Sequence, residues 1–123
     1  MRKTIFVVDD SSIALIVSRK ALLEHYNPIT LPSATKMFEL IKKVKPSLIL
    51  LDLEMPEMNG FQALEKLKND DEYSDIPVIF LTGTEDPVRQ AEGLKRGAVD
   101  FILKPFDDVE LVSRVKFHMD MAY

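Results

Sequence analysis

The stretch "SLILLDLEMPEMNG", residues 47–60, decides the fold class of this chain. Its apolar run ends on the acid Asp52, and a second acid follows at Glu54. A strand this apolar is expected to be buried on both faces, as the strands of parallel sheets are. Met55-Pro56 then blocks regular structure, and Asn59-Gly60 is typical of a turn. The carboxylate of Asp52 is therefore predicted to stand at the end of a rigid, central strand.

On both sides of this stretch, short apolar runs alternate with amphipathic ones. The runs predict strands at 4–9, 28–31, 47–52, 77–82 and 100–104, and the 3.6-residue periodicity predicts helices at 12–24, 34–44 and 60–69. A fourth helix is expected from Asp86-Pro87 to a stop at Gly97, and a fifth from the capping-box pair Asp107 and Glu110 to Met119. This alternation predicts an α/β fold, a doubly wound five-stranded parallel sheet with five helices and right-handed crossovers.

The composition fits one soluble globular domain spanning residues 1–123. Hydrophobic residues make up 46% of the chain and charged residues 29%. The net charge of −4 argues against direct nucleic acid binding. The absence of cysteine excludes disulfides and thiolate metal sites. The N-terminal apolar stretch, 5–8, is too short for a signal peptide or a membrane span, so a cytoplasmic location without membrane contact is the expectation.

Polar side chains that could take part in binding or catalysis stand at the carboxyl ends of four predicted strands. Asp9-Asp10 closes the first, Asp52 the third, Thr82-Gly83 the fourth and Lys104-Pro105 the fifth. Functional crevices of open α/β sheets lie outside these ends. Taken singly, each residue is more often a cap, a turn or a solvated loop charge. Together the four strand ends favour one shared site.

Three carboxylates at one edge repel each other unless one holds a proton or a cation lies among them. No histidine accompanies the acids, since His25 and His118 are interpreted as surface or packing residues, so a hard cation is expected and Mg²⁺ fits best. Lys104 adds a mobile positive charge and Thr82 a hydroxyl. These groups are the ones that stabilise a transferring phosphoryl group. Asp52, which stands alone on its strand, is the natural phosphoacceptor.

The chain resembles response-regulator receiver domains of two-component signalling over its whole length. The matching elements are "VVDD" with Asp9-Asp10, the "LDLEMPEMNG" block around Asp52, Thr82 after "IPVIFL", and "KPF" at 104–106. All four occur in order, at separations similar to those of the family. The resemblance implies a flavodoxin-like sheet with strand order 2-1-3-4-5.

The resemblance also implies roles for the acids. Asp52 would accept a phosphoryl group from the phosphohistidine of a sensor histidine kinase or a phosphotransfer protein. Asp10, Asp52 and the backbone carbonyl of Glu54 would bind Mg²⁺, with Asp9 helping, often through water. Glu54 also occupies one of the two positions that tune hydrolysis in the family, and Thr84 occupies the other.

Thr82 and Lys104 would contact the phosphoryl oxygens, and the Lys104-Pro105 bond would be cis. Phe101 falls at the family's switch aromatic. Thr82 and Phe101 would change the surface made by helix four, strand five and helix five, which would control a target protein or an output domain. A phosphorylation-dependent homodimer is compatible with this scheme, as is a chain that forms the N-terminal part of a longer regulator.

Other classes fit less well. An Mg²⁺-dependent aspartyl-phosphate phosphohydrolase would carry D-x-D-x-T where this chain has Asp52-Leu53-Glu54-Met55-Pro56. A flavodoxin-type nucleotide or flavin domain would need a phosphate-cradling loop after the first strand. A pseudo-receiver, an interaction module without phosphorylation, is disfavoured by the intact set of acids, threonine and lysine. Self-phosphotransfer and autodephosphorylation are then the only chemistry expected, so the domain is not predicted to be an enzyme. Sequence features around "GAVDFILKPF" resemble receivers of hybrid kinases and cyclic-dinucleotide regulators more than those of DNA-binding regulators, which often carry a second acid where Val99 stands.

Overall fold

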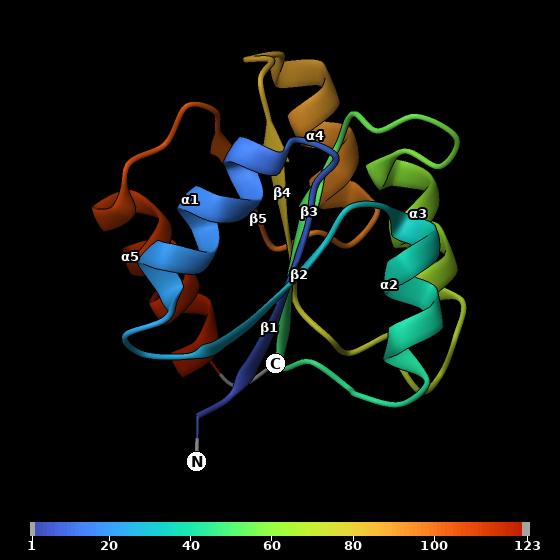
Figure 1. Cartoon of the computed structure of the whole chain (residues 1–123). Coiled ribbons are helices and arrows are strands. Elements are labelled where there is room, and N and C mark those ends of the chain that lie inside the picture. The colour runs from blue at the N-terminus through green and yellow to red at the C-terminus, as the bar shows by residue number, and fades with distance from the viewer. Residues whose placement is uncertain (1, 122–123) are drawn as a thin grey trace.

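The computed structural model describes residues 2–121 and has one parallel sheet in the order β2-β1-β3-β4-β5 (Figure 1). The strands are β1 (Thr4–Val8), β2 (Asn27–Leu31), β3 (Leu48–Asp52), β4 (Val78–Thr82) and β5 (Asp100–Leu103). β3 is central and pairs with β1 on one side and β4 on the other. The predicted fold class and strand order are confirmed.

In the part of the chain that the structure describes, five helices cover the two faces of the sheet. Figure 1 shows α1 (Ser12–Leu22) and α5 (Asp108–Asp120) on one face, and α2 (Ala34–Ile41) and α3 (Gly60–Lys68) on the other. The fourth helix, α4 (Pro87–Lys95), packs on the same face as α3, since its Gly93 lies against the ring of Phe80. Within residues 2–121, none of the helices combines the length and apolar character needed to cross a bilayer.

The apolar run of β3 is buried on both faces, as its sequence predicts. Leu48 and Leu50 contact the core under α1 and α5, whereas Ile49 and Leu51 contact the core under α2 and α3. All four side chains are fully buried. Because burial of one such side chain stabilises a protein by about 1.5–3 kcal/mol, a register slip that exposed them would be costly. The end of β3 is therefore a fixed point.

Element boundaries differ from the predicted ones by one to three residues. β1 ends at Val8, before Asp9, and β5 ends at Leu103, before Lys104. α1 ends at Leu22 instead of residue 24, and α2 ends at Ile41 instead of residue 44. After α2, Val44 continues the apolar periodicity and packs against the core, whereas Leu23 after α1 is 43% exposed.

The interpretation of Asn59-Gly60 as a turn is wrong. Asn59 is the N-cap of α3 and exchanges hydrogen bonds of 2.9 Å with Gln62, which forms a complete capping box. At the predicted box of α5, Asp107 accepts a hydrogen bond of 2.7 Å from the N–H of Glu110 and acts as a simple cap. A Cβ on Gly60 would lie 2.7 Å from the carbonyl oxygen of Asp52, so glycine lets α3 start directly against the end of β3.

Candidate functional site

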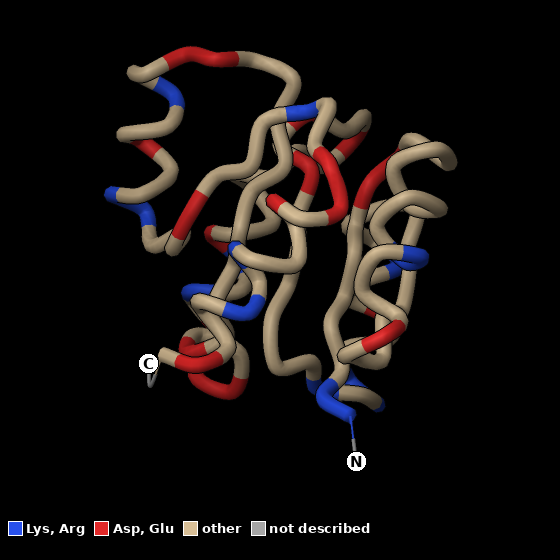
Figure 2. Tube along the Cα trace, turned by 90° about the vertical axis from the view of Figure 1, so that its left-hand side faces the viewer, with Lys and Arg blue, Asp and Glu red and all other residues tan. Residues whose placement is uncertain are grey.

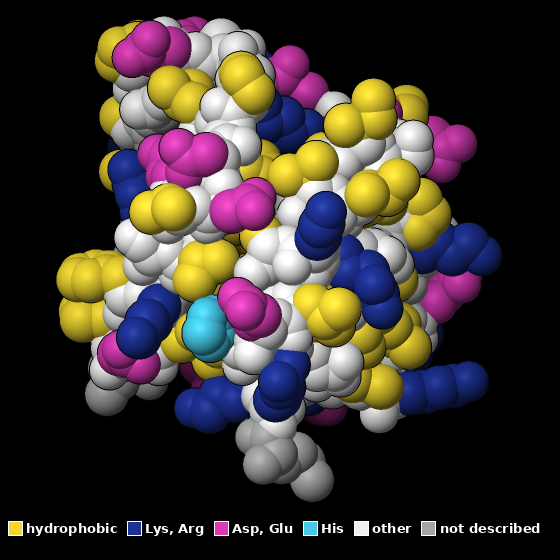
Figure 3. All heavy atoms as spheres, turned by 60° about the vertical axis from the view of Figure 1, so that its left-hand side comes forward, with side chains coloured by type: hydrophobic (Ala, Val, Ile, Leu, Met, Phe, Trp, Pro, Cys, Tyr) yellow, Lys and Arg dark blue, Asp and Glu magenta, His cyan; other side chains and the backbone are white. Residues whose placement is uncertain are grey.

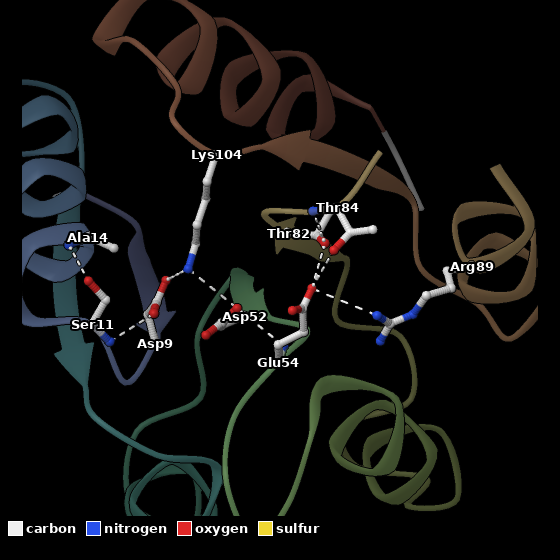
Figure 4. A network of polar contacts seen from close by, with 9 residues as sticks. All are labelled: Asp9, Ser11, Ala14, Asp52, Glu54, Thr82, Thr84, Arg89 and Lys104. Carbon is white, nitrogen blue, oxygen red and sulfur yellow. Dashed lines mark hydrogen bonds and ion pairs between the residues drawn. The ribbon is translucent and has the colours of Figure 1, made fainter. Parts of the chain in front are cut away.

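The sheet brings the sequence-predicted residues together at one edge (Figure 4). Asp9 follows β1, Asp52 is the last residue of β3, Thr82 is the last residue of β4, and Lys104 follows β5. Because the strands are parallel, these positions share the carboxyl edge of the sheet. Figure 2 shows acidic residues along the loops at that upper end of the molecule.

Asp9, Asp10 and Asp52 form an acid cluster whose carboxylate oxygens can lie within 4.8 Å of one another. Asp9 is fully buried, Asp52 is 3% exposed and Asp10 is exposed. The Oδ1 atom of Asp9 accepts a hydrogen bond of 2.9 Å from the N–H of Ser11, the N-cap of α1. The cluster thus lies at the junction of β1, β3 and the start of α1.

Lys104 is the cation of this cluster. Its Nζ atom lies 2.6 Å from Asp9 Oδ2 and 3.4 Å from Asp52 Oδ1. Burial acts to lower the pKa of Lys104, but the contacts with Asp9 and Asp52 outweigh it, so the pKa is raised and the amine stays charged. The Lys104-Pro105 peptide bond is cis, the isomer that the family resemblance implies.

Asp52 is protonated unusually easily for a carboxyl group. Burial is the largest cause and the negative charge of Asp9 adds to it, while Lys104 acts in the opposite direction; the pKa of Asp52 is raised to about 7. One lysine therefore does not compensate the acids. A carboxylate needed in its ionised form at this place requires additional positive charge.

The donor set of the acid cluster fits a divalent cation. Asp9 Oδ2 is buried and has an ion pair with Lys104 but, among the described residues, no hydrogen bond of ordinary geometry. Such a carboxylate oxygen retains a lone pair for a metal. The ligand atoms of the cluster are all carboxylate oxygens, which are preferred by hard cations. The structure thus supports a metal-binding cluster at the predicted acids.

On the other side of Asp52 lies a second group, the threonine group, made of Glu54, Thr82, Thr84 and Arg89. Glu54 Oε1 accepts hydrogen bonds from the hydroxyls of Thr82, at 3.1 Å, and Thr84, at 3.2 Å. The N–H of Thr84 donates to Thr82 Oγ1 at 3.1 Å, and Arg89 of α4 lies 3.8 Å from Glu54 Oε1. The hydroxyl proton of Thr82 therefore points to Glu54 (Figure 4).

The sequence did not predict the hydrogen bonds of Glu54 with Thr82 and Thr84, or its ion pair with Arg89. Thr82 lies 28 residues from Glu54 along the chain, and no local pattern pairs them. The pairing arises because β3 and β4 are neighbours in the sheet, which places the loop after each strand beside the other.

Phe101 on β5 packs inward, against the neighbouring strand. Its ring centroid lies 5.4 Å from that of Phe80, which in turn lies 5.5 Å from that of Phe61 on α3. The guanidinium of Arg89 lies 5.6 Å from the centroid of Phe61. An aromatic row thus runs from β5 to α3 beneath α4.

A polar network on β5 and α5 was also missed. His118, interpreted from the sequence as a surface or packing residue, is 5% exposed, and its Nε2 atom lies 3.0 Å from Asp100 Oδ2. Arg114 donates to Asp100 Oδ1 at 2.8 Å. Burial acts to raise the pKa of Asp100, but the contacts with His118, the Phe101 N–H and Arg114 outweigh it, so the pKa is lowered. Arg114 and His118 are four residues apart and so lie on the same face of α5. This spacing is the signal that could have indicated a shared partner such as Asp100.

Comparison with known proteins shows the family. The model of the response regulator receiver domain matches residues 5–116, so the chain belongs to this family. It is 37% identical over 117 residues to the DNA-binding response regulator MtrA of Mycolicibacterium paratuberculosis, covering 94% of this chain and 51% of that protein. It is 35% identical over 116 residues to the "Probable cyclic di-GMP phosphodiesterase" of Vibrio cholerae, covering 94% of this chain and 26% of that protein.

Solved structures agree with this assignment. The signal receiver domain of a signal transduction histidine kinase from Syntrophus aciditrophicus is 34% identical, with a TM-score of 0.85 over 95% of this chain and 89% of that one. A response regulator from Chloroflexus aurantiacus, 24% identical with a TM-score of 0.92 over 98% of this chain and 100% of that one, supports the fold. The chain is thus a receiver domain of two-component signalling.

The chain spans at most about half the length of these two curated relatives, 26% of one and 51% of the other. Their names refer to different activities, cyclic-dinucleotide cleavage and DNA binding. A DNA-binding regulator is as similar to this chain as the phosphodiesterase is, so overall identity does not favour one kind of relative over the other.

Proposed function

We propose that this domain is a phosphorylation-controlled switch in which Asp52 is the phosphoacceptor. The observation that carries the proposal is the place of Asp52, a buried carboxylate at the end of the central strand with Lys104 3.4 Å away and two further acids beside it. A carboxylate oxygen of Asp52 would bond to the phosphorus of a phosphohistidine. The phosphorus–nitrogen bond breaks, and the imidazole nitrogen keeps the electron pair and takes a proton from solvent.

Asp9, Asp10, Asp52 and the backbone carbonyl of Glu54 would hold Mg²⁺. When bound, the metal supplies positive charge for the phosphoryl oxygens. Asp52 must be ionised to attack, and its raised pKa of about 7 means that the acid cluster alone leaves part of it protonated at neutral pH. Lys104 favours the ionised form and is placed to contact a phosphoryl oxygen once the group is on Asp52.

Thr82 would donate its hydroxyl to another phosphoryl oxygen. To do so it must leave Glu54, since a hydroxyl has one proton and Glu54 Oε1 now accepts it at 3.1 Å. A phosphoryl group brings about −1.5 to −2 charges close to the carboxylate of Glu54, which favours the exchange. Loss of the hydrogen bond from Thr82 to Glu54 would change the contact between Glu54 and Arg89, and this change would alter α4. Thr82 and Phe101 are the switch residues of this proposal.

The phosphodonor, a histidine kinase or a phosphotransfer protein, would dock on the apolar rim next to Lys104. A hollow of about 300 Å³ is lined by Ser11, Ile13, Ala14, Val17, Lys104, Pro105 and Phe106. Ile13 is 73% exposed and Ile16 is 66% exposed. Figure 3 shows hydrophobic side chains that reach the surface among charged ones on this side of the molecule. The rim is continuous with the site through Lys104, so a protein seated there could bring its histidine to Asp52.

The signal would leave through the surface made by α4, β5 and α5, to a target protein, an output domain or a second copy of the chain. Residues 1–123 form one receiver domain in this proposal, with self-phosphotransfer and autodephosphorylation as its only chemistry. The predicted cytoplasmic location and the absence of direct nucleic acid binding stay predictions.

The test is mass spectrometry after incubation with acetyl phosphate and Mg²⁺. The parent chain should gain one phosphoryl group, and Asp52→Asn should gain none. Glu54→Gln is the matched control, because it changes a neighbouring acid but leaves Asp52 in place, and it should still be labelled. Labelling of Asp52→Asn at the level of the parent would overturn the proposal.

A further inference from the structure

Helix α4 packs against the rest of the protein through a glycine. Of its nine residues, Pro87–Lys95, Gly93 is the buried one. The hydrophobic side chains of Val88 and Leu94 are 78% and 49% exposed. The helix therefore rests on what lies beneath it and inserts no large side chain into the core.

The ring of Phe101 occupies the space under Gly93. A Cβ on Gly93 would lie 2.6 Å from Cζ of Phe101 and 3.1 Å from Cε2 of Phe80. Contacts below 3.0 Å are essentially never made by real Cβ atoms. Residue 93 therefore has no room for a side chain while Phe101 lies inward, and we call this space the Gly93 niche.

Space beside Phe101 lies along β5, the last strand of the sheet. A hollow of about 320 Å³ between α4 and α5 is lined by Glu85, Gln90, Leu94, Asp100, Phe101, Leu103, Glu110 and Arg114. The backbone of Phe101 is held, because its N–H donates to Asp100 at 2.8 Å and its carbonyl accepts from Arg114 at 3.0 Å. Rotation about the side-chain bonds would therefore carry the ring from the niche toward this hollow.

The inward ring coexists with a Thr82 hydroxyl that still bonds to Glu54. The position of Phe101 in this structure therefore does not depend on a displaced Thr82. The missing side chain at position 93 is the feature that permits it.

We propose that Gly93 is the positioning residue for Phe101: by leaving the niche open, it lets the ring lie under α4. The functional meaning of this position rests on the proposed function, in which Phe101 is a switch residue. In that proposal the phosphoryl group acts on α4 through Glu54 and Arg89. Any side chain at position 93 would drive the ring toward the hollow between α4 and α5.

The test compares Gly93→Ala with Gly83→Ala in unphosphorylated protein. Gly83 is the matched control, because a Cβ there would meet no atom of residues 2–121 within 4 Å. Nuclear Overhauser contacts between the Phe80 and Phe101 rings should be lost in Gly93→Ala, with new contacts from Phe101 to Leu103 and Leu94, and should be retained in Gly83→Ala. Ring contacts in Gly93→Ala equal to those of the parent would overturn the proposal.

A second comparison keeps the test decisive if Gly93→Ala folds poorly. In a Phe101→Leu background the ring tip is gone, but Cε2 of Phe80 still lies 3.1 Å from the added Cβ. Gly93→Ala should therefore lower the melting temperature less in this background than in the parent background. Equal lowering in both backgrounds would show that Phe101 does not fill the niche. Neither the ring contacts nor the melting temperatures require phosphorylation. A negative result in these two measurements is therefore distinguishable from a failure to label Asp52.

Discussion

The two groups on either side of Asp52 are built differently. The acid cluster and Lys104 lie between strands, with Asp9 0% and Asp52 3% exposed and an ion pair of 2.6 Å. The threonine group lies partly in solvent: the side chain of Glu54 is 48% exposed and that of Arg89 is 38% exposed, at a distance of 3.8 Å. One group is fixed by the sheet, and the other joins a loop to a helix.

This difference indicates a division of labour. Chemistry at Asp52 needs charges held at constant distances in a place of low dielectric, which the strand ends provide. A response needs contacts that a new charge can rearrange, and exposed ion pairs contribute only about 0–1 kcal/mol. α4 buries only Gly93 of its nine residues, so few packing contacts oppose a movement of this helix. The site therefore combines a rigid half and a changeable half.

The largest expected effect concerns the rigid half in metal-free protein. The pKa of Asp52 is raised from 3.8 to about 7, chiefly by burial and then by Asp9. The folded state therefore holds a proton that the unfolded state releases, so the free energy of unfolding should fall as pH rises from about 4 to about 7. At about 1.4 kcal/mol per pKa unit, the full loss is about 4 kcal/mol.

Urea denaturation at pH 5 and pH 8, in the presence of a chelator, measures this loss. Asp52→Asn cannot ionise and should be more stable than the parent by a larger margin at pH 8 than at pH 5. The same margin at both values would mean that Asp52 titrates normally and that the acid cluster is not strained.

Removal of an acid from the cluster should weaken the metal site. We expect Asp10→Ala to bind Mg²⁺ at least about tenfold less tightly, a loss of about 1.4 kcal/mol, because one of few oxygen ligands is gone. Calorimetric titration measures the dissociation constant, and Asp71→Ala, which changes an exposed acid outside the cluster, is the control. Magnesium should also raise the stability of the parent by linkage. Equal affinity of Asp10→Ala and parent would remove Asp10 from the ligand set.

In the changeable half, the hydrogen bond from Thr82 to Glu54 should compete with the phosphoryl group. Glu54→Ala frees the hydroxyl and removes a negative charge, so beryllium fluoride, a phosphoryl mimic, should bind about three- to tenfold more tightly, or by about 0.7–1.4 kcal/mol. Glu54→Gln keeps an acceptor but no charge, and should lie between parent and Glu54→Ala. If both variants match the parent, Glu54 does not restrain Thr82.

The smallest effect is expected at Arg89. Its contact with Glu54 is 3.8 Å long and partly exposed, so Arg89→Ala should change the free energy of unfolding by no more than about 0.5 kcal/mol. Amide chemical shifts of α4, however, should respond less to beryllium fluoride than those of the parent. A response of α4 equal to that of the parent would mean that the two halves communicate by another route.

The sequence by itself determined the architecture and the chemically active edge. Apolar runs and amphipathic periods are local signals, and the run that ends at Asp52 is buried on both faces as its composition requires. Parallel strands place all their carboxyl ends on one edge, so Asp9, Thr82 and Lys104 could be assigned to the same site as Asp52 without a structure.

The tertiary structure alone decided how side chains from distant segments meet. Whether Glu54 faces solvent or Thr82 depends on the paths of two loops, and no periodicity encodes those paths. The same is true of Phe101, whose place under Gly93 is fixed by how closely α4 approaches β5. Contacts between loops and across helices depend on distances of a few tenths of an ångström in the packed molecule, whereas strand ends are set by chain direction alone.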